Sequence, residues 1–493
     1  MIKWKDVSFN YPGQKSDGLQ HVNLSIFPGE CVLFCGRSGC GKTTMLRLVN
    51  GLIPSFFSGE GDGAVYLEGQ DCSEIPMYRL AERVGSVFQN PRTQFFNVDT
   101  DSEIAFGMEN RAIPPAELVR RVEQTSRELN IEALRGKSIF ALSGGEKQKI
   151  AFASVYAMNP DVYLLDEPSS NLDMDSIHAL KEHLKLVKGQ GKTILIAEHR
   201  LYYLMELADK IVYLERGWIK GIYKPKELAA LSQEQRASMG LRAADLQQLR
   251  PQKRVKCAQA PMLELKNVRL CYRKKTVLEN ICLQAARGEI IAVAGHNGAG
   301  KTTFSRALCG LHKGCEGEFA LEGKALDAKD RRKSSYLVMQ DVGYQLFAES
   351  VEKECVFGIK NPDAALADRT LEALDLSSFR EKHPNTLSGG QKQRLAVAVS
   401  MVCGKDILVF DEPTSGLDYD SMIRVATLME QLAEQGAIVF VVTHDYELVC
   451  RVCTRIVCFD EGSLSDDLPV TAENEGKIRE LFGLFTVPVF RAF

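Results

Sequence analysis

The chain repeats itself, and this repeat constrains its fold more than any other feature of the sequence. Two copies of one motif set in a chain of 493 residues indicate two similar domains. Three motifs of the first half return in the same order in the second: GRSGCGKTT (36–44) as GHNGAGKTT (295–303), LSGGEKQKIA (142–151) as LSGGQKQRLA (387–396), and LLDEPSSNLD (164–173) as VFDEPTSGLD (409–418).

The spacing of the motifs differs between the copies. The first pair is 259 residues apart and the other two pairs are 245 apart, so the first copy carries 14 extra residues between its first two motifs. Some of them lie in the Gly-rich stretch 53–63, which we interpret as a surface loop. We place the domains at 1–222 and 262–462, with a solvated, partly helical linker at 223–261. A C-terminal tail at 463–493 either folds back on the second domain or covers a subunit surface.

Short apolar runs alternate with helical patterns in both copies. Such runs, flanked by glycine or charge and separated by helices, are typical of parallel strands that are buried on both faces. The sequence therefore predicts an α/β fold with a mostly parallel sheet in each domain. The runs are ECVLFCG, DVYLLDE and KTILIAEH in the first copy, and EIIAVAG, DILVFDE and AIVFVVTH in the second.

The composition restricts the classes of function. A net charge of −3 provides no global basic field, so no nucleic-acid partner is expected. No apolar run is long enough to cross a bilayer, so any membrane role requires a partner. The 14 cysteines, in a chain without an export signal, indicate a reducing compartment. Cys450 and Cys453 form a C-x-x-C pair, interpreted as buried and structural, with a metal or redox role as the alternative.

Each copy contains a phosphate-binding loop of the pattern G-x-x-x-x-G-K-[ST], placed between a predicted strand and a predicted helix. Glycines allow backbone N–H groups to surround a phosphate, and the following helix directs its positive end at the anion. The lysine reaches the β and γ phosphates and the first threonine binds Mg²⁺. The loop residues are Gly36, Arg37, Ser38, Gly39, Cys40, Gly41, Lys42, Thr43 and Thr44, and Gly295, His296, Asn297, Gly298, Ala299, Gly300, Lys301, Thr302 and Thr303.

An acid pair and a histidine follow apolar runs in each copy. Buried parallel strands deliver such side chains to the carboxyl edge of the sheet, where ligands bind in open α/β sheets. One acid can hold Mg²⁺ through water, and the next can polarise a water for attack on the γ phosphate. The histidine suits a sensor of that phosphate. The residues are Asp166, Glu167 and His199, and Asp411, Glu412 and His444.

The LSGGE and LSGGQ motifs beside two phosphate loops resemble those of ATP-binding-cassette (ABC) ATPases with two cassettes on one chain. The resemblance covers nearly the whole sequence except the linker and the tail. It implies two tandem P-loop domains, each with a helical signature subdomain beside its sheet, and ATP and Mg²⁺ as cofactors. It also implies an intramolecular pseudo-dimer, in which the signature of one cassette binds the nucleotide held by the other.

The resemblance assigns further residues to the two sites. Tyr11 and Tyr272 match the aromatic residue that stacks on adenine, with an ordinary strand tyrosine as the alternative. Asp173 and Asp418 match the loop that couples the sites. The first site would combine its phosphate loop with Gln89, Asp166, Glu167 and His199, closed by Ser388, Gly389, Gly390 and Gln391. The second would use Gln340, Asp411, Glu412 and His444, closed by Ser143, Gly144, Gly145 and Glu146. The implied Mg²⁺ ligands are Thr43, Gln89 and Asp166, and Thr302, Gln340 and Asp411.

The segments after Gln89 and Gln340 resemble those of energy-coupling-factor importers. Each has a second glutamine five residues on, at Gln94 and Gln345, followed by aromatic or apolar residues and an acidic helix start. In that group the segment forms a short helix beside the groove for a transmembrane partner. Residues at these positions would present apolar surface to that partner, with core packing as the alternative: Phe95, Phe96, Leu346 and Phe347.

The resemblance implies an import motor for a vitamin, its precursor or a transition-metal ion, bound peripherally at the cytoplasmic face of the cell membrane. Its partners would be a coupling transmembrane protein and a substrate-binding membrane protein. Two alternatives are the fused ATPase of a sugar-type importer and a soluble ribosome-associated protein. The first group usually has a degraded second site, whereas Lys301 and Glu412 are intact here. The second typically carries a long charged helical segment between its cassettes.

Nothing that hydrolysis needs is deleted, so we predict two competent sites. We expect them to be unequal, because one signature ends in Glu146 and the other in Gln391. The surroundings of the two histidines also differ. His199 lies between Glu198 and Arg200, whereas the neighbours of His444 are Thr443 and Asp445.

Overall fold

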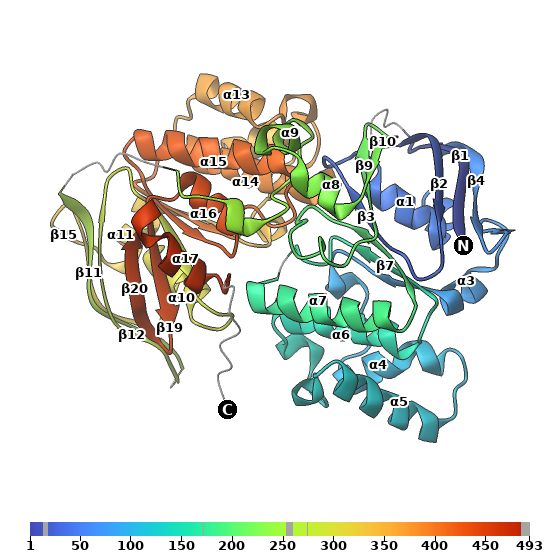
Figure 1. The fold of residues 1–493 in the computed structure, drawn as a ribbon. Helices are drawn as coiled ribbons and strands as arrows, with labels where there is room; N and C mark the ends of the chain where they lie inside the picture. Colours follow the sequence, from blue (N-terminus) through green and yellow to red (C-terminus); the bar gives the residue numbers. More distant parts are fainter. Residues whose placement is uncertain (13–17, 171, 253–259, 274, 485–493) are drawn as a thin grey trace. The chain divides into compact units, whose positions relative to one another are not determined.

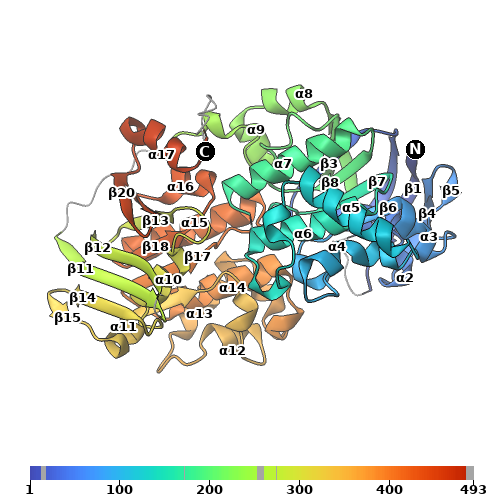
Figure 2. The same cartoon turned by 90° about the horizontal axis from the view of Figure 1, so that it is seen from below.

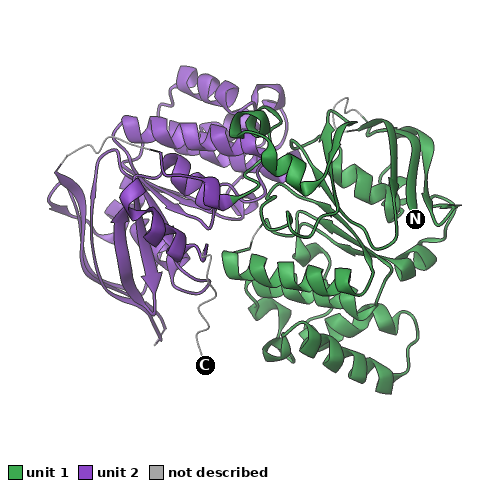
Figure 3. Ribbon diagram, viewed as in Figure 1, with its two compact units in different colours: residues 1–245 green, residues 246–493 purple. Residues whose placement is uncertain are grey.

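The computed structural model describes residues 1–12, 18–170, 172–252, 260–273 and 275–484. The chain divides into two compact units, which we call unit 1 (Met1–Asp245) and unit 2 (Leu246–Phe493), as coloured in Figure 3. Both units contain a six-stranded sheet and a four-stranded sheet. The predicted α/β fold with two tandem cassettes is therefore confirmed.

The central sheet of unit 1 has the strand order β10-β9-β3-β8-β7-β6. All neighbouring pairs are parallel except β9 and β10, which are antiparallel. The three apolar runs predicted from the sequence are the adjacent strands β3, β8 and β7. The bounds are β3 Cys31–Cys35, β6 Val84–Val87, β7 Val162–Asp166, β8 Thr193–Ala197, β9 Lys210–Glu215 and β10 Trp218–Tyr223.

Both faces of this sheet are covered, which explains why its strands are apolar throughout. On β3, Leu33 packs in a core with helices α6 (Gly144–Ala157) and α7 (Met174–Gly189). Its neighbours Val32 and Phe34 pack instead against α1 (Lys42–Val49) and the four-stranded sheet. Figure 1 shows these layers on opposite sides of the central sheet.

The four-stranded sheet is antiparallel, with the order β2-β1-β4-β5. Beside the central sheet stand the helices of the predicted signature subdomain, α4 (Thr100–Glu109), α5 (Pro115–Glu128) and α6. The remaining elements of unit 1 are β1 Ile2–Asn10, β2 Leu19–Ile26, β4 Glu60–Leu67, β5 Gln70–Asp71, α2 Leu52–Ser55, α3 Met77–Arg83, α8 Pro225–Ala230 and α9 Gln233–Ser238.

Unit 2 repeats this plan. Its central sheet has the order β16-β17-β18-β13-β19-β20, parallel except for the last pair, and its second sheet has the order β12-β11-β14-β15. In Figure 2 the helices α12, α13 and α14 gather apart from the four-stranded sheet. The bounds are β11 Pro261–Tyr272, β12 Lys275–Ala286, β13 Ile290–Ala294, β14 Cys315–Leu321, β15 Lys324–Ala325, β16 Ser335–Val338, β17 Ile407–Asp411, β18 Ile438–Val442, β19 Arg455–Asp460 and β20 Ser463–Pro469, with α10 Lys301–Leu308, α11 Ala328–Ser334, α12 Val351–Cys355, α13 Ala364–Ala373, α14 Gly389–Val402, α15 Tyr419–Glu434, α16 Tyr446–Val452 and α17 Glu475–Leu481.

The Gly-rich stretch of the first copy is not a loop throughout, so the interpretation as a surface loop is wrong for much of 53–63. Residues 60–63 begin strand β4, where Gly61 pairs with Phe9 and Asp62 with Ser8 on β1. The pairing uses backbone groups, while the residues themselves are small or exposed. The sequence therefore lacks the apolar alternation by which a strand is recognised.

Part of the predicted linker belongs to unit 1. Residues 223–245 include α8 and α9, and their apolar residues Leu228 and Leu241 are buried in the core of that unit. The sequence of this stretch suggests a solvated segment, because its few buried apolar residues are separated by polar residues and do not recur at a helical or strand period. Residues 253–259 of the linker lie outside the described residues.

The described part of the tail packs on unit 2. Strand β20 pairs with β19, and in α17 the side chain of Ile478 is fully buried. The ring of Phe482 contacts Tyr446 at a centroid distance of 5.5 Å. Residues 485–493 of the tail lie outside the described residues. Over the ranges that the structure describes, no helix is long and apolar enough to span a bilayer.

Candidate nucleotide sites

The phosphate loop of unit 1 adopts a conformation that only glycine allows at some positions. It joins β3 to α1, and Gly36 and Gly41 have φ values of 142° and 104°. A Cβ atom on Gly36 would lie 2.2 Å from the carbonyl oxygen of Leu214, and one on Gly41 would lie 2.7 Å from Leu19 Cδ2. The loop is thus held against neighbouring chain, with its curvature set by backbone that carries no side chain.

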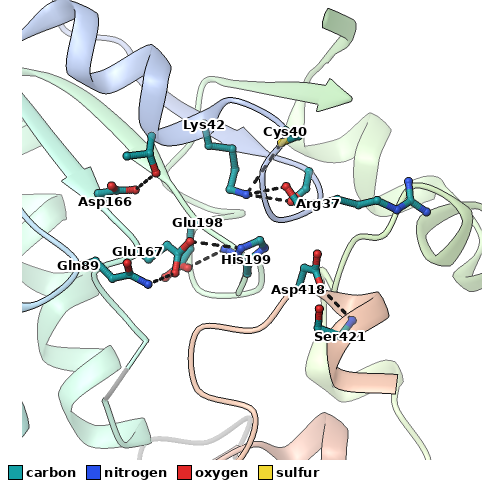
Figure 4. A network of polar contacts seen from close by, with 12 residues as sticks. Arg37, Cys40, Lys42, Gln89, Asp166, Glu167, Glu198, His199, Asp418 and Ser421 are labelled. Atoms are coloured by element: carbon teal, nitrogen blue, oxygen red, sulfur yellow. Dashed lines mark hydrogen bonds and ion pairs between the residues drawn. The ribbon is translucent and has the colours of Figure 1, made fainter. Parts of the chain in front are cut away.

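Lys42 is the first residue of α1 and is only 5% exposed. Its Nζ atom donates hydrogen bonds of 3.1 Å to the carbonyl oxygens of Gly36 and Arg37 (Figure 4). The Arg37 guanidinium turns away to Glu215 and to the Ser238 carbonyl. The loop therefore presents backbone N–H groups, a lysine and a helix N-terminus together, which suits a phosphate group.

Asp166, the last residue of β7, accepts a hydrogen bond of 3.0 Å from Thr43 Oγ1. Burial and the neighbouring Glu167 raise the pKa of Asp166 to about 7, despite that hydrogen bond and the Lys42 ammonium. A hydroxyl and a partly buried carboxylate side by side are hard oxygen ligands, and a cation would offset the cost of withdrawing the charge from water. This donor set fits Mg²⁺.

Glu167 lies between Gln89 and His199 (Figure 4). Gln89 Nε2 donates a hydrogen bond of 2.6 Å to Glu167 Oε2, and His199 Nε2 lies 3.3 Å from Oε1. That buried imidazole nitrogen makes no hydrogen bond within the described residues. The sequence-predicted glutamine, glutamate and histidine of unit 1 therefore meet, and the imidazole retains bonding capacity toward a ligand.

Unit 2 builds the same arrangement around its own phosphate loop and acid pair. Lys301 Nζ bonds to the carbonyl oxygens of Gly295 and His296 at 2.6 and 3.0 Å, and Thr302 Oγ1 donates to Asp411 at 3.1 Å. Burial raises the pKa of Asp411.

The largest difference between the units concerns the glutamine. His444 Nε2 lies 3.7 Å from Glu412 Oε1, and Gln340 is exposed and forms no hydrogen bond to Glu412 within the ranges that the structure describes. The two acid–glutamine–histidine groups are thus unequal in the structure.

The signature motifs form the starts of long helices. Ser143 caps α6, where Glu146 N donates to Ser143 Oγ at 3.3 Å and Ser143 N donates to Glu146 Oε2 at 2.8 Å. Ser388 and Gln391 form the same reciprocal pair at the start of α14. Burial alone would raise the pKa of Glu146, but the hydrogen bonds from Ser143 outweigh it and lower this pKa. Gly144 and Gly145, and Gly389 and Gly390, are the first residues of the two helices, so both motifs offer backbone N–H groups at a helix N-terminus.

Asp173 and Asp418 also cap helices. Asp173 Oδ1 accepts a hydrogen bond of 2.9 Å from Ser176 N at the start of α7, and Asp418 Oδ1 accepts one of 2.8 Å from Ser421 N at the start of α15. Both carboxylates are buried. The coupling role that the resemblance implies for these residues remains a prediction, since within each unit they serve as N-caps.

The two tyrosines predicted to stack on adenine have different supports. The Tyr11 hydroxyl accepts a hydrogen bond of 3.1 Å from Arg47 Nη1 and lies 3.3 Å from Thr44 Oγ1. Tyr272 is half exposed, and its hydroxyl lies 3.5 Å from Arg306 Nη1. Tyr11 follows β1 and contacts α1, whereas Tyr272 ends β11 and contacts α10. Both helices follow a phosphate loop.

The second glutamines fix the segment that follows the first ones. Gln94 accepts from Phe88 N at 3.2 Å, and Gln345 accepts from Met339 N at 2.7 Å. A short 3₁₀ helix precedes each of them, at Pro91–Thr93 and Val342–Tyr344. The glutamines are therefore structural supports of these segments.

The apolar residues next to these glutamines divide between surface and core. Phe96 and Phe347 are 74% and 69% exposed. Leu346 is buried, so its interpretation as surface is wrong and the alternative of core packing holds. Phe95 is partly buried against the core of unit 1. Each apolar pair turns one side chain inward and one outward, as an extended segment over a core does.

Sequence reasoning missed two buried glutamates that anchor these segments. Glu103 Oε2 accepts from the backbone N–H groups of Phe96 and Asn97 at 3.0 and 2.8 Å. Glu354 Oε2 accepts from Phe347 and Ala348 at 2.7 and 2.6 Å. The signal was present, because the two glutamates repeat at the 251-residue spacing of Gln94 and Gln345.

Cys450 and Cys453 are buried, and burial raises the pKa of the Cys450 thiol to about 12. No disulfide and no group of metal-ligating side chains occurs in the part of the chain that the structure describes. A thiol of such high pKa is a poor nucleophile. The interpretation of the C-x-x-C pair as structural is consistent with these surroundings.

Comparison with known proteins agrees with this geometry. The family model described as ABC transporter matches residues 19–170 and 278–415. A putative ABC transporter ATP-binding protein of Treponema denticola is 49% identical over 483 residues, which cover 96% of this chain and 98% of that protein. Another, from Methanosarcina mazei, is 33% identical and covers 95% of this chain and 89% of its own.

A chain in a structure of ribosome-bound archaeal Pelota and ABCE1 covers 97% of this chain and 80% of its own, with a TM-score of 0.72. At 21% identity this likeness shows the fold alone.

Taken with the sequence relatives, the two-cassette fold and its two phosphate loops define an ATPase of the ABC type. The chain belongs to the ABC transporter family of ATP-binding proteins, whose domains bind ATP, typically with Mg²⁺.

Replacing Gly36 by alanine tests the loop geometry. We expect Gly36→Ala to weaken MgATP binding at one of two sites by roughly ten- to a hundredfold. An alanine at this position would be strained by about 1–3 kcal/mol, and the loop would change shape to relieve that strain. Gly295→Ala should affect the other site, since its Cβ would lie 2.3 Å from the Phe459 carbonyl oxygen. Gly189→Ala, with nothing within 4 Å, is the control. Calorimetric titration decides; equal affinities of Gly36→Ala and the control would contradict the assignment.

Proposed function

We propose that this protein is the ATP-hydrolysing motor of a membrane importer of the energy-coupling-factor type. The observation that supports hydrolysis best is the meeting of Glu167, Gln89 and His199 at the edge of the sheet where Lys42 and Asp166 also lie. In unit 2, Lys301, Thr302 and Asp411 make equivalent contacts and His444 lies beside Glu412, which supports a second hydrolysis site although Gln340 forms no hydrogen bond to Glu412 within the described residues.

The residues of unit 1 divide the work of phosphoryl transfer. Lys42 and the loop N–H groups bind the β and γ phosphates of ATP, and Thr43, Asp166 and Gln89 would hold Mg²⁺, which when bound neutralises phosphate charge. Glu167 takes the proton of the water whose oxygen attacks the γ phosphorus, while the bond to the bridging oxygen of ADP breaks. His199 donates to a γ-phosphate oxygen and orients the group.

Each nucleotide would be closed by the signature of the other unit. The N-termini of α6 and α14 carry Ser143 and Ser388 and present backbone N–H groups of the first helical turn, which favour an anion such as the γ phosphate. ATP would then join the two units, and loss of the γ phosphate after hydrolysis would release them. This cycle is the motion that a transport motor needs.

The proposed docking surface for the transmembrane partner is aromatic. Phe96 is exposed and stacks on Phe106 with ring centroids 4.8 Å apart. Phe347 and Phe357, which are both exposed, occupy the equivalent positions 251 residues later. Exposed aromatic side chains that recur in both units at the segment after the Mg²⁺-sensing glutamine are expected where a partner helix docks.

The proposed partners are a coupling transmembrane protein and a substrate-binding membrane protein, and the imported compound is a vitamin, its precursor or a metal ion. We place the motor at the cytoplasmic face of the membrane, attached through these partners. The translocase activity follows from that assembly and belongs to the complex as a whole.

Separate replacement of the two glutamates tests two-site hydrolysis. We expect Glu167→Gln and Glu412→Gln each to lower steady-state ATPase activity, because removing a general base costs its site roughly 10²–10⁴-fold in turnover. The double variant should be inactive while still binding ATP. If one single replacement leaves the activity unchanged, only one site hydrolyses and the proposal of two competent sites fails.

Fractionation and pull-down test the docking surface. The chain should co-purify with small integral membrane proteins, and Phe96→Ser combined with Phe347→Ser should abolish that association without loss of ATPase activity. Tyr78→Ser, which changes an exposed aromatic residue elsewhere on unit 1, is the control. Sedimentation of the chain with ribosomes in place of membranes would contradict the proposed transport role.

A further inference from the structure

A buried carboxylate stands beside the site histidine in each unit, but it comes from opposite sides of that histidine. In unit 1 it is Glu198, the residue before His199. In unit 2 it is Asp445, the residue after His444. Both are almost fully buried, at 2% and 4% exposure.

Glu198 connects the histidine loop to the turn after Glu167. Its Oε1 atom accepts hydrogen bonds from Ser169 N at 3.2 Å, from Ser169 Oγ and from Tyr203 OH at 2.9 Å. Its Oε2 atom accepts from His199 N at 2.7 Å. Ser169 is two residues beyond Glu167, so one carboxylate spans both parts of the reaction site.

Asp445 makes the equivalent connection in unit 2. Thr414, two residues beyond Glu412, donates from Oγ1 to Asp445 Oδ2 at 2.8 Å. The other oxygen of Asp445 accepts from Leu448 N at 3.3 Å and so caps α16. The hydroxyl of the same turn is thus held by a carboxylate in both units, although the carboxylates occupy different sequence positions.

In each unit, a different residue occupies the position that carries the carboxylate in the other unit. At the position of Asp445, unit 1 has Arg200, whose Nη1 donates to the carbonyl oxygens of Ser169 and Leu172 at 3.3 Å each. At the position of Glu198, unit 2 has Thr443, whose Oγ1 accepts from Asp445 N at 3.0 Å. What the units share is therefore the carboxylate–hydroxyl bond and not the residue that provides it.

The place of this bond indicates what it does. Glu167 and Glu412 have φ values of 45° and 51°, a conformation that non-glycine residues adopt only when their surroundings impose it. The bond fixes the turn two residues beyond each glutamate to the loop that carries the histidine. It thereby sets the position of the glutamate relative to the imidazole. The distance from the histidine Nε2 to the glutamate Oε1 is 3.3 Å in unit 1 and 3.7 Å in unit 2.

We infer that Glu198 and Asp445 are positioning residues for hydrolysis, and that the required carboxylate can be supplied from either side of the histidine. The inference rests on the proposed function in one respect, the roles of the glutamate and the histidine. It adds a determinant of turnover that touches neither ATP nor the attacking water.

The test relocates the carboxylate in a chain with one active site. In a Glu412→Gln parent, Glu198→Thr removes the carboxylate, and Glu198→Thr with Arg200→Asp supplies it from the other side, as in unit 2. We expect Glu198→Thr to lower kcat for ATP at least about tenfold, with KM changed less than about threefold. The relocated double variant should recover kcat to within about threefold of the parent.

Two further variants separate positioning from folding. Ser169→Ala removes only the hydroxyl and should lower kcat like Glu198→Thr, even if the latter folds poorly. Tyr156→Phe is the matched control, because the Tyr156 hydroxyl donates to Glu128 at 2.6 Å, a bond of the same kind away from the site. It should leave kcat unchanged.

The outcomes are distinguishable. Full kcat in Glu198→Thr or Ser169→Ala, or a relocated double variant no better than folded Glu198→Thr, would overturn the positioning role alone. An inactive Glu412→Gln parent would overturn the proposal of two competent sites, and this inference with it. Recovery of kcat by the relocated carboxylate would support both.

Discussion

The parallel pairing of four neighbouring strands is the constraint on which the rest of each unit depends. In unit 1, β3 pairs with β8, β8 with β7, and β7 with β6, all in the same direction. The carboxyl ends of these strands therefore meet at one edge of the sheet. The groups that follow them, namely the phosphate loop, His199, the Asp166–Glu167 pair and Gln89, are brought together although they are spread over more than a hundred residues of sequence.

This edge concentrates features that cost stability. The partly buried Asp166 carboxylate has a raised pKa, and Glu167 has a positive φ. A buried imidazole nitrogen of His199 makes no hydrogen bond within the described residues. Such features persist where the surrounding fold imposes them, and they cluster at functional sites. The apolar layers on both faces of the sheet supply that support, since β3 is buried along its whole length.

Much of this could be predicted from the sequence, because motifs and buried strands leave strong local patterns. The strands before Lys42, Asp166 and His199 stood out as apolar runs, and the repeat removed chance as an explanation. Features that depend on backbone pairing or on single buried contacts left weaker patterns. The start of β4 near Gly61 has no apolar alternation, Leu228 is an isolated anchor in a polar stretch, and Leu346 differs from its exposed neighbour only in direction.

The missed polar residues show a further limit. Glu103 and Glu198 are ordinary acidic residues in the sequence, and their importance appears only once their buried hydrogen-bond partners are known. For Glu198 a repeat search misleads, because the equivalent carboxylate in unit 2 lies two positions later, at Asp445. Both units thus form the same carboxylate–hydroxyl bond, but the carboxylate comes from different sequence positions. An alignment of the two copies would therefore show no conserved carboxylate at this position.

We propose above all that each unit completes the site of the other. The measurement that tests it most directly is an experimental structure of the Glu167→Gln, Glu412→Gln chain with MgATP bound. We expect two nucleotides, with Ser388 against the γ phosphate of the one held by Lys42 and Ser143 against that of the one held by Lys301. Two nucleotides bound with both signature helices facing solvent would contradict it.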